Sequence, residues 1–240
     1  PYACRLGMSE GQASGYALEQ LEYLLASQTA PKDTAAILIE SVLGEGGYIV
    51  PPTSFMKGLR EICNKHGILL IFDEVQSGFG RTGKWFALEH FGVVPDLITA
   101  AKGLASGMPL SGVFSRTEIM KKVDVGSIGG TYGGNAVACA SGVATIRAMR
   151  DEKMLENAAE RGIQLVTGLR KLQEEYPQIG DVRGLGLMIG TEFVADGRAD
   201  KAKPMVKEIV HAAEERNLLL LTCGTYDNVV RWIPPLNVTS

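Results

Sequence analysis

Short apolar runs recur along the first two thirds of this chain, and glycine, proline or charged residues bound each of them. Runs of four to eight apolar residues with such boundaries are typical of buried strands in a parallel sheet. The predicted strands cover residues 35–40, 68–73 and 97–101, with a further strand at 111–115 that we expect to run in the opposite sense. Strands separated by helical segments predict an α/β fold.

Helix signals separate these strands. Ser9 and Gln12 have the spacing of a capping box, which predicts a helix from there to about Leu25. Thr53 is expected to cap a second helix, which Gly67 ends. Further helical stretches are predicted at residues 116–122 and 135–150, with a glycine-rich loop at 126–134.

The composition changes near residue 152, where a long charged amphipathic helix is predicted to run to about Tyr176. Its apolar stripe comprises Leu155, Ala158, Ala159, Ile163, Val166 and Leu169. Strands at 186–194, 218–222 and 229–233 and a helix at 203–216 are expected to follow. Strands mixed with helices after a long connecting helix predict a small α+β domain, so we expect domains at 1–152 and 153–240.

The 240 residues are 45% hydrophobic and carry a formal net charge of −3. This hydrophobic content supports a core, and the charge gives no electrostatic footprint for nucleic acid or an anionic membrane. No apolar run reaches the length of a membrane span, and no signal-peptide pattern opens the chain. The four cysteines and three histidines lack metal-ligand spacing. We therefore expect reduced thiols, no metal and a cytoplasmic location.

Two of the predicted strands end in residues that carry chemistry. The strand at 68–73 ends in Asp73, and Lys102 directly follows the strand at 97–101. Parallel sheets place ligands at the carboxyl ends of their strands, so we expect both side chains to face one crevice, with the amine buried. Such an amine condenses with the aldehyde of a cofactor, and the acid pairs with a ring nitrogen. A surface lysine and a helix-capping aspartate are the open alternatives.

Several motifs surround these residues in a fixed order. They are Gly44-Glu45-Gly46-Gly47, Asp73-Glu74-Val75, Gly80-Arg81-Thr82-Gly83, Pro95-Asp96-Leu97, Ala101-Lys102-Gly103, residues 130–135, residues 180–186 and Asn228-Val229-Val230-Arg231. With these motifs the chain resembles the class III aminotransferases, and among them the 4-aminobutyrate branch, along nearly its whole length.

This resemblance implies the fold type I of transferases that depend on pyridoxal 5'-phosphate (PLP), with a parallel-rich sheet in the large domain and a truncated α+β small domain. It implies that Lys102 binds the PLP aldehyde and that Asp73 pairs with the pyridine nitrogen. Val75 would pack against the ring, and Gln76 would bind its phenolic oxygen. Thr131 would reach the phosphate of the neighbouring subunit's cofactor, which implies a homodimer with a shared active site. An ordinary loop glutamine and a plain Gly-Gly-Thr turn are the alternatives.

The resemblance also implies a substrate-selecting pair. In 4-aminobutyrate aminotransferases, the glutamate that matches Glu45 covers the arginine that matches Arg231, and it swings away when an α-carboxylate binds. A static salt bridge is the alternative. Glu40 would support the site from the preceding strand. The family's usual Glu-Pro-Val-Gln is here Glu40-Ser41-Val42-Leu43, a departure that bears on the substrate rather than on the cofactor.

These residues predict PLP-dependent transamination between an ω-amino acid, such as 4-aminobutyrate, and 2-oxoglutarate. Two alternatives are open: an amino-acid racemase or epimerase of the same family, and a non-catalytic fragment that makes oligomer contacts. The second arises because nothing before Glu40 matches the family's glycine- and serine-rich phosphate loop or its stacking aromatic residue. We therefore expect the chain to be an internal fragment of a longer enzyme.

Overall fold

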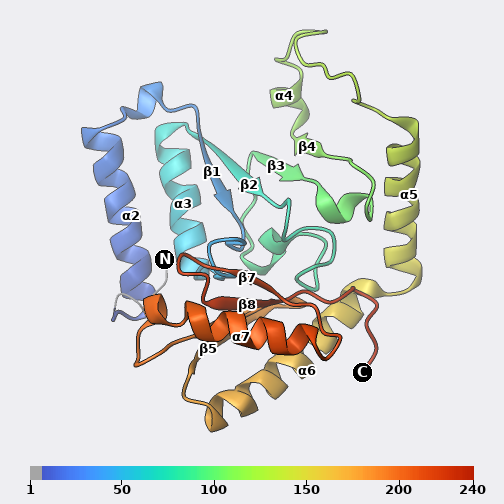
Figure 1. The fold of residues 1–240 in the computed structure, drawn as a ribbon. Helices are drawn as coiled ribbons and strands as arrows, with labels where there is room; N and C mark the ends of the chain where they lie inside the picture. The colour runs from blue at the N-terminus through green and yellow to red at the C-terminus, as the bar shows by residue number, and fades with distance from the viewer. Residues whose placement is uncertain (1–6) are drawn as a thin grey trace. The chain divides into compact units, whose positions relative to one another are not determined.

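The computed structural model describes residues 7–240, and its elements are labelled in Figure 1. The chain divides into two compact units. Among the described residues, the first unit comprises residues 7–41, Pro51–Phe79 and Phe86–Ala148, and the second comprises Val42–Val50, Gly80–Trp85 and Met149–Ser240. The assignment of residues 1–152 and 153–240 to two domains stays a prediction.

Four strands form the sheet of the first unit, in the order β1-β2-β3-β4. Strands β1 (Ala36–Glu40), β2 (Leu69–Asp73) and β3 (Leu97–Ala100) are parallel, whereas β4 (Gly112–Ser115) is antiparallel to β3. All four strands lie within a residue of their predicted positions, and the opposite sense of the last one is confirmed. Leu70 and Phe72 of β2 are fully buried, which explains why an apolar run located this strand.

Two helices of the first unit, α2 (Glu10–Ser27) and α3 (Thr53–His66), pack side by side (Figure 1). The predicted capping box is present: the Ser9 side chain accepts from the Gln12 N–H, and the Ser9 N–H donates to the Gln12 side chain. Gly67 ends α3 with a φ of 68°, a left-handed conformation that glycine adopts without steric cost. The prediction that Thr53 caps α3 was wrong, because Pro52 holds the capping position with its fixed φ.

The remaining elements of this region are short, apart from one helix. They are the 3-10 turns η1 (Pro31–Asp33), η2 (Ala87–His90) and η3 (Lys102–Leu104) and the helices α4 (Thr117–Met120) and α5 (Ala136–Asp151). The helices predicted at 116–122 and 135–150 are therefore confirmed.

The second unit has an antiparallel sheet of order β5-β6-β8-β7. Its strands are β5 (Ile179–Leu185), β6 (Met188–Phe193), β7 (Leu221–Cys223) and β8 (Val229–Trp232). The sequence predicted a single strand at 186–194, and β5 was missed. Gly180 and Gly184 interrupt the apolar pattern of β5, because glycine contributes no side chain to the core.

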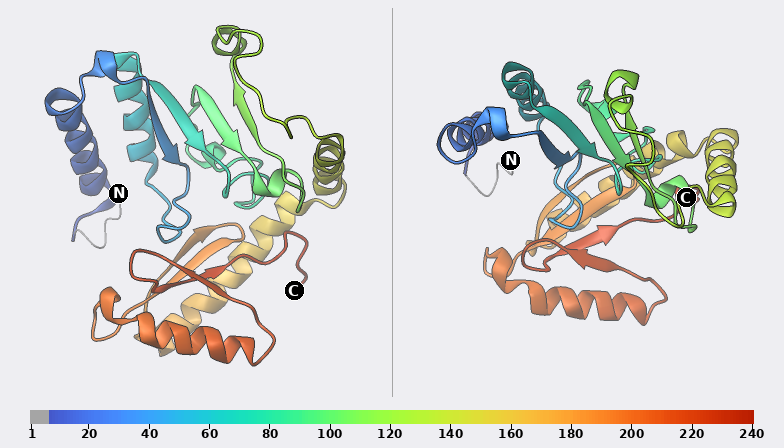
Figure 2. Two further views of the ribbon diagram at one scale, coloured as in Figure 1. Left: turned by 45° about the horizontal axis from the view of Figure 1, so that its top comes forward. Right: turned by 90° about the horizontal axis from the view of Figure 1, so that it is seen from above.

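Two helices, α6 (Met154–Glu175) and α7 (Lys203–Glu214), pack against this sheet (Figure 2), and the 3-10 turn η4 (Ala199–Lys201) precedes α7. Their shared core contains Leu169, Ile179, Val182, Ile189, Phe193, Ala202, Val206 and Val230. Ala158 and Leu169 of the predicted stripe are buried, but Ile163 is 70% exposed, so its placement was wrong. Gly162 takes the inward position instead, where a Cβ would lie only 2.1 Å from the carbonyl oxygen of Gly186.

Three further features of residues 7–240 bear on function. None of the helices in this range combines the length and the apolar character that a membrane span requires. Within the same range no three His, Cys, Asp or Glu side chains are grouped to hold a metal ion. Cys63, Cys139 and Cys223 are free thiols, whereas Cys4 lies outside the described residues.

Candidate active site

Asp73 and Lys102 lie at the carboxyl ends of adjacent parallel strands, as the sequence predicted. Asp73 is the last residue of β2, where it pairs in register with Thr99 of β3 and with Glu40, the last residue of β1. Lys102 comes two residues after the end of β3. The topology therefore gathers two carboxylates and an amine at one edge of the sheet.

The Asp73 carboxylate is held by the chain that follows it. The N–H of Val75 donates to its Oδ1 at 2.9 Å, and Asp73, Val75 and Gln76 are all half-buried. This bond from two residues ahead fixes the carboxylate at the end of the strand and leaves Oδ2 for another donor. The roles of Val75 and Gln76 toward a cofactor stay predictions.

Lys102 occupies an uncommon backbone conformation. Its φ is 42°, in the left-handed region that non-glycine residues rarely adopt, and it opens the turn η3. The expectation of a buried amine was wrong for this chain by itself, because Lys102 is exposed. The backbone beside it is close-packed nonetheless: a Cβ at Gly103 would lie 3.2 Å from the Cβ of Phe79.

A pocket of about 700 Å³ in the first unit brings Lys102 together with the glycine-rich loop. It is lined by Lys102, Thr131, Gly107–Ser111 and the glycines that flank Thr131. Asp73, Val75 and Gln76 do not line it. Successive glycines leave backbone N–H groups open to an anion, and the Thr131 hydroxyl adds a donor, so the loop is suited to a phosphate.

Glu74 is a residue whose importance the sequence did not reveal. It directly follows Asp73, is fully buried and accepts four hydrogen bonds. Its donors are the Ser41 Oγ at 2.6 Å, the Ser77 Oγ at 2.6 Å, the Ala87 N–H at 3.0 Å and the Leu88 N–H at 2.8 Å. Glu74 therefore ties the end of β1 and the turn η2 to the segment that carries Asp73 and Gln76.

Glu45 and Arg231 form an ion pair within the second unit. Arg231 projects from β8, and its side chain is 13% exposed, whereas that of Glu45 is 68% exposed. The pairing expected from the sequence is present, and its role in substrate selection stays a prediction. The buried Nε of Arg231 has no hydrogen-bond partner among residues 7–240, so the guanidinium has donor capacity beyond Glu45.

Tyr48 lies beside this pair and was not singled out from the sequence. It is 1% exposed, and burial raises the pKa of its hydroxyl to about 12. The positive charge of Arg231 opposes this rise in pKa, which places the guanidinium near the hydroxyl. The buried Tyr48 side chain excludes water from one side of the Arg231 guanidinium. The effective dielectric there is lower, which strengthens the attraction of the guanidinium for a carboxylate.

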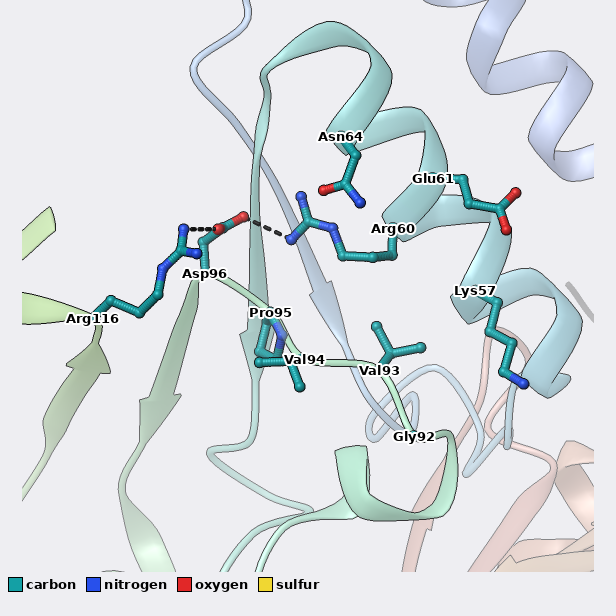
Figure 3. A pocket seen from close by; sticks show the side chains of 10 residues that line it. All are labelled: Lys57, Arg60, Glu61, Asn64, Gly92, Val93, Val94, Pro95, Asp96 and Arg116. Carbon is teal, nitrogen blue, oxygen red and sulfur yellow. Dashed lines mark hydrogen bonds and ion pairs between the residues drawn. The ribbon is translucent and has the colours of Figure 1, made fainter. Parts of the chain in front are cut away.

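A second pocket of the first unit, of about 450 Å³, is lined in part by an ion-pair cluster (Figure 3). Asp96 accepts hydrogen bonds from Arg60 at 2.7 Å, from Arg116 at 2.6 Å and from the Leu70 N–H at 2.8 Å. Burial acts to raise the pKa of Asp96, but these hydrogen bonds together hold it below its usual value. The cluster ties α3 and the end of β4 to the central strands, so it stabilises the fold.

The whole chain, residues 1–240, matches the protein family described as aminotransferase class-III. This chain belongs to the class III aminotransferases. It is 47% identical to the 5-aminovalerate aminotransferase DavT of Pseudomonas putida, over 92% of this chain and 52% of that protein. It is 46% identical to the 4-aminobutyrate aminotransferase GabT of Escherichia coli strain K12, over 99% of this chain and 55% of that protein. The class III chain thus spans about half the length of these curated relatives.

Solved aminotransferase structures share this fold. The PLP-bound amine transaminase from an uncultivated Pseudomonas species has a TM-score of 0.87 and is 34% identical, over 96% of this chain and 54% of that one. The acetylornithine aminotransferase of Elizabethkingia anophelis has a TM-score of 0.83 and is 35% identical, over 92% of this chain and 54% of that one. The predicted fold type I is therefore confirmed, and class III aminotransferases use PLP, the predicted cofactor.

The residues of this class III chain fit PLP. The Lys102 amine and the Asp73 carboxylate suit an aldehyde and a ring nitrogen, and the loop at Thr131, which the resemblance assigns to the neighbouring subunit's cofactor, offers donors to a phosphate. The backbone next to the amine is closely packed, because a Cβ at Gly103 would require the Phe79 Cβ to shift by a few tenths of an ångström.

Proposed function

We propose that the complete protein is a PLP-dependent aminotransferase that exchanges an amino group between an ω-amino acid, of the 4-aminobutyrate or 5-aminovalerate type, and 2-oxoglutarate. The ion pair between Glu45 and Arg231 is the observation that carries the choice of substrate. The names of the relatives at 46–47% identity, which act on these two ω-amino acids, support the same choice. A racemase has no need to alternate between a substrate with an α-carboxylate and one without it.

The cofactor, when bound, supplies an electron-withdrawing ring that stabilises negative charge on the substrate carbon bearing the amino group. Asp73, as a carboxylate, would pair with the pyridine nitrogen and favour its protonated form. Lys102 would hold the aldehyde, and its amine, once free, would move a proton at the substrate carbon. Val75 would pack against the ring and Gln76 would donate to its phenolic oxygen.

Glu45 and Arg231 select between the two substrates. With an ω-amino acid, no α-carboxylate is present, and Glu45 keeps the guanidinium neutralised. With glutamate or 2-oxoglutarate, Glu45 leaves and the substrate α-carboxylate takes its place in a charge-assisted interaction. The low exposure of Arg231 and the high exposure of Glu45 support a fixed cation with a movable acid.

Glu45→Ala in the complete protein tests this function. The free-energy cost of losing the pair lies between two limits. It is ~1 kcal/mol for an exposed pair and ~3–5 kcal/mol when a buried charge is left unpaired. We expect kcat/KM of the ω-amino half-reaction to fall about tenfold or more, and that of the glutamate half-reaction to change much less. Asp200→Ala, which removes the acid of an exposed pair with Arg198, is the matched control. Equal losses in both half-reactions would make the pair a structural bridge.

We also propose that the protein acts as a cytoplasmic homodimer that shares its active site. Large apolar side chains are exposed on the segment that carries Thr131, as a surface covered by a second copy requires: Val113, Phe114, Ile128, Tyr132, Val137 and Val143. Sedimentation of the complete protein with PLP checks the dimer, and a monomer with full activity would contradict it.

A further inference from the structure

Two arginines and a glycine form a row across the sheet of the second unit. Arg183 of β5 pairs in register with Gly190 of β6, and Gly190 pairs with Arg231 of β8. Residues that pair directly across antiparallel strands project from the same face. Their chain neighbours Val182, Ile189 and Val230 belong to the apolar core, so the row lies on the face opposite that core.

The turn that carries Glu45 sits on this row. A Cβ at Gly190 would lie 3.1 Å from the Cβ of Tyr48 and 3.6 Å from the carbonyl oxygen of Gly47. Any side chain larger than hydrogen at position 190 would therefore press on the turn. Because Gly190 has no side chain, residues 44–48 can pack against the sheet between the two arginines.

Two contacts hold the backbone of this turn in place within the second unit. The Gly224 N–H donates to the Glu45 carbonyl at 2.9 Å. Arg183 donates to the Gly47 carbonyl twice, from Nε at 3.0 Å and from Nη2 at 2.6 Å. The first contact comes from the backbone and is insensitive to substitution, whereas the second depends on one side chain.

Arg183 is itself held in place. Its Nη1 donates to Asp181 Oδ2 and to Glu192 Oε2, both at 2.8 Å, and its side chain is 11% exposed. Asn228 donates to Glu192 Oε1 at 3.4 Å. These contacts neutralise the guanidinium and leave its Nε and Nη2 directed at one carbonyl oxygen.

We propose that Arg183 is a specificity-determining positioning residue, which anchors the Gly47 carbonyl so that Glu45 returns to Arg231 whenever no α-carboxylate is bound. This inference rests on the proposed function, because it assigns Arg183 a part in the same substrate switch. Holding the backbone confines the motion to the Glu45 side chain and keeps the closed pair in one geometry. Arg183 acts through Glu45 and contacts neither substrate nor cofactor.

Arg183→Lys is the decisive variant. A lysine keeps a positive charge for Asp181 and Glu192, but one ammonium group cannot also supply two N–H donors to the Gly47 carbonyl. The readout is the ratio of kcat/KM for the ω-amino half-reaction to kcat/KM for the glutamate half-reaction, measured on the PLP-loaded complete protein. We expect this ratio to fall about tenfold, which corresponds to ~1.4 kcal/mol. Arg198→Lys, at an exposed pair, should leave it unchanged.

Gly190→Ala is an independent perturbation that leaves Arg183 intact. The added methyl group would lie 3.1 Å from both the Tyr48 Cβ and the Val229 Cγ1, so these neighbours must shift by a few tenths of an ångström. A shift of Tyr48 displaces the turn, and the ratio should then fall in the same direction. Gly168→Ala is the matched control, because a Cβ there meets no atom within 4 Å. A loss of correctly folded protein lowers both half-reactions alike and leaves the ratio constant, so the ratio separates positioning from folding.

The Glu45→Ala background completes the test. If Arg183 acts through Glu45, then Arg183→Lys adds less than about a twofold change in the ratio when Glu45 is absent, since coupled sites are not additive. A full additional change in that background would overturn the inference. A ratio that shifts in Glu45→Ala but stays constant in Arg183→Lys and Gly190→Ala would also overturn the inference. The proposed function would then stand. A constant ratio in Glu45→Ala itself would refute the proposed function, and the inference with it.

Discussion

The buried carboxylate of Glu74 offers a sharp test of how the candidate site is supported. Each of its oxygens accepts one serine hydroxyl and one backbone N–H: Oε1 from Ser41 and Leu88, and Oε2 from Ser77 and Ala87. Glu74→Gln keeps the shape and replaces one oxygen by an NH2 group. A serine hydroxyl can rotate to accept from this group, but a backbone N–H cannot.

The magnitude follows from this inventory. Whichever way the amide turns, one buried N–H faces another donor, which costs about 1–3 kcal/mol. The two bonds to the remaining oxygen lose their charge assistance, which removes roughly another 1–2 kcal/mol. A neutral amide is cheaper to bury than a carboxylate, which offsets part of the loss. We therefore expect Glu74→Gln to lower the free energy of unfolding by about 2–3 kcal/mol.

Urea unfolding of the complete protein, followed by circular dichroism, measures this change. Glu61→Gln, at an exposed position on α3, carries the same chemical substitution and should change the free energy of unfolding by less than about 0.5 kcal/mol. A loss below about 1 kcal/mol for Glu74→Gln would show that the four bonds do not hold this segment as the geometry indicates.

Two further perturbations probe the first and second units separately. Asp96→Asn removes the charge that pairs with Arg60 and should lower the free energy of unfolding by about 3 kcal/mol. The control Asp200→Asn, at an exposed pair, should lower it by less than about 1 kcal/mol. Equal losses for the two variants in urea unfolding would contradict this expectation. Burial raises the pKa of Tyr48 to about 12, so between pH 10 and 12 the folded protein keeps a proton that the unfolded chain loses. The free energy of unfolding should therefore fall by up to ~2–3 kcal/mol as the pH rises through this range. Burial also raises the pKa of the Cys223 thiol to about 11, so the Tyr48 contribution is read between pH 11 and 12. Tyr48→Phe should remove the slope in that range, and Tyr176→Phe, at an exposed site, should not. An unchanged slope in Tyr48→Phe would assign it to another group.

Local signals located most of the secondary structure. The capping box at Ser9 and the glycine at position 67 act within one turn of helix, so the sequence alone shows them. The strand β5 escaped because two glycines hide its alternation, although its partner β6 supplies the missing pairing in space. Ile163 was misplaced for a related reason: the inward position belongs to a glycine, which an apolar pattern does not register.

In the candidate site, too, some features could be predicted from the sequence and others are visible only in the fold. Asp73 and Lys102 could be placed at one sheet edge because parallel strands impose it, and the pairing of Glu45 with Arg231 came from the family's motifs. The four donors around Glu74 come from three separate segments, so no local pattern contains them. The contact of Arg183 with Gly47 joins residues 136 positions apart and involves a carbonyl that every residue has, so only the fold reveals it.

We propose that Lys102 is the lysine that holds PLP. Borohydride reduction of the PLP-loaded complete protein makes that attachment permanent, and proteolysis with mass mapping then identifies the labelled lysine. We expect the pyridoxyl phosphate on the peptide that contains Lys102, no stable label in Lys102→Ala, and a normal label in Lys121→Ala, whose lysine is exposed beside α4. A label on any other lysine of the unaltered protein would refute the assignment of Lys102.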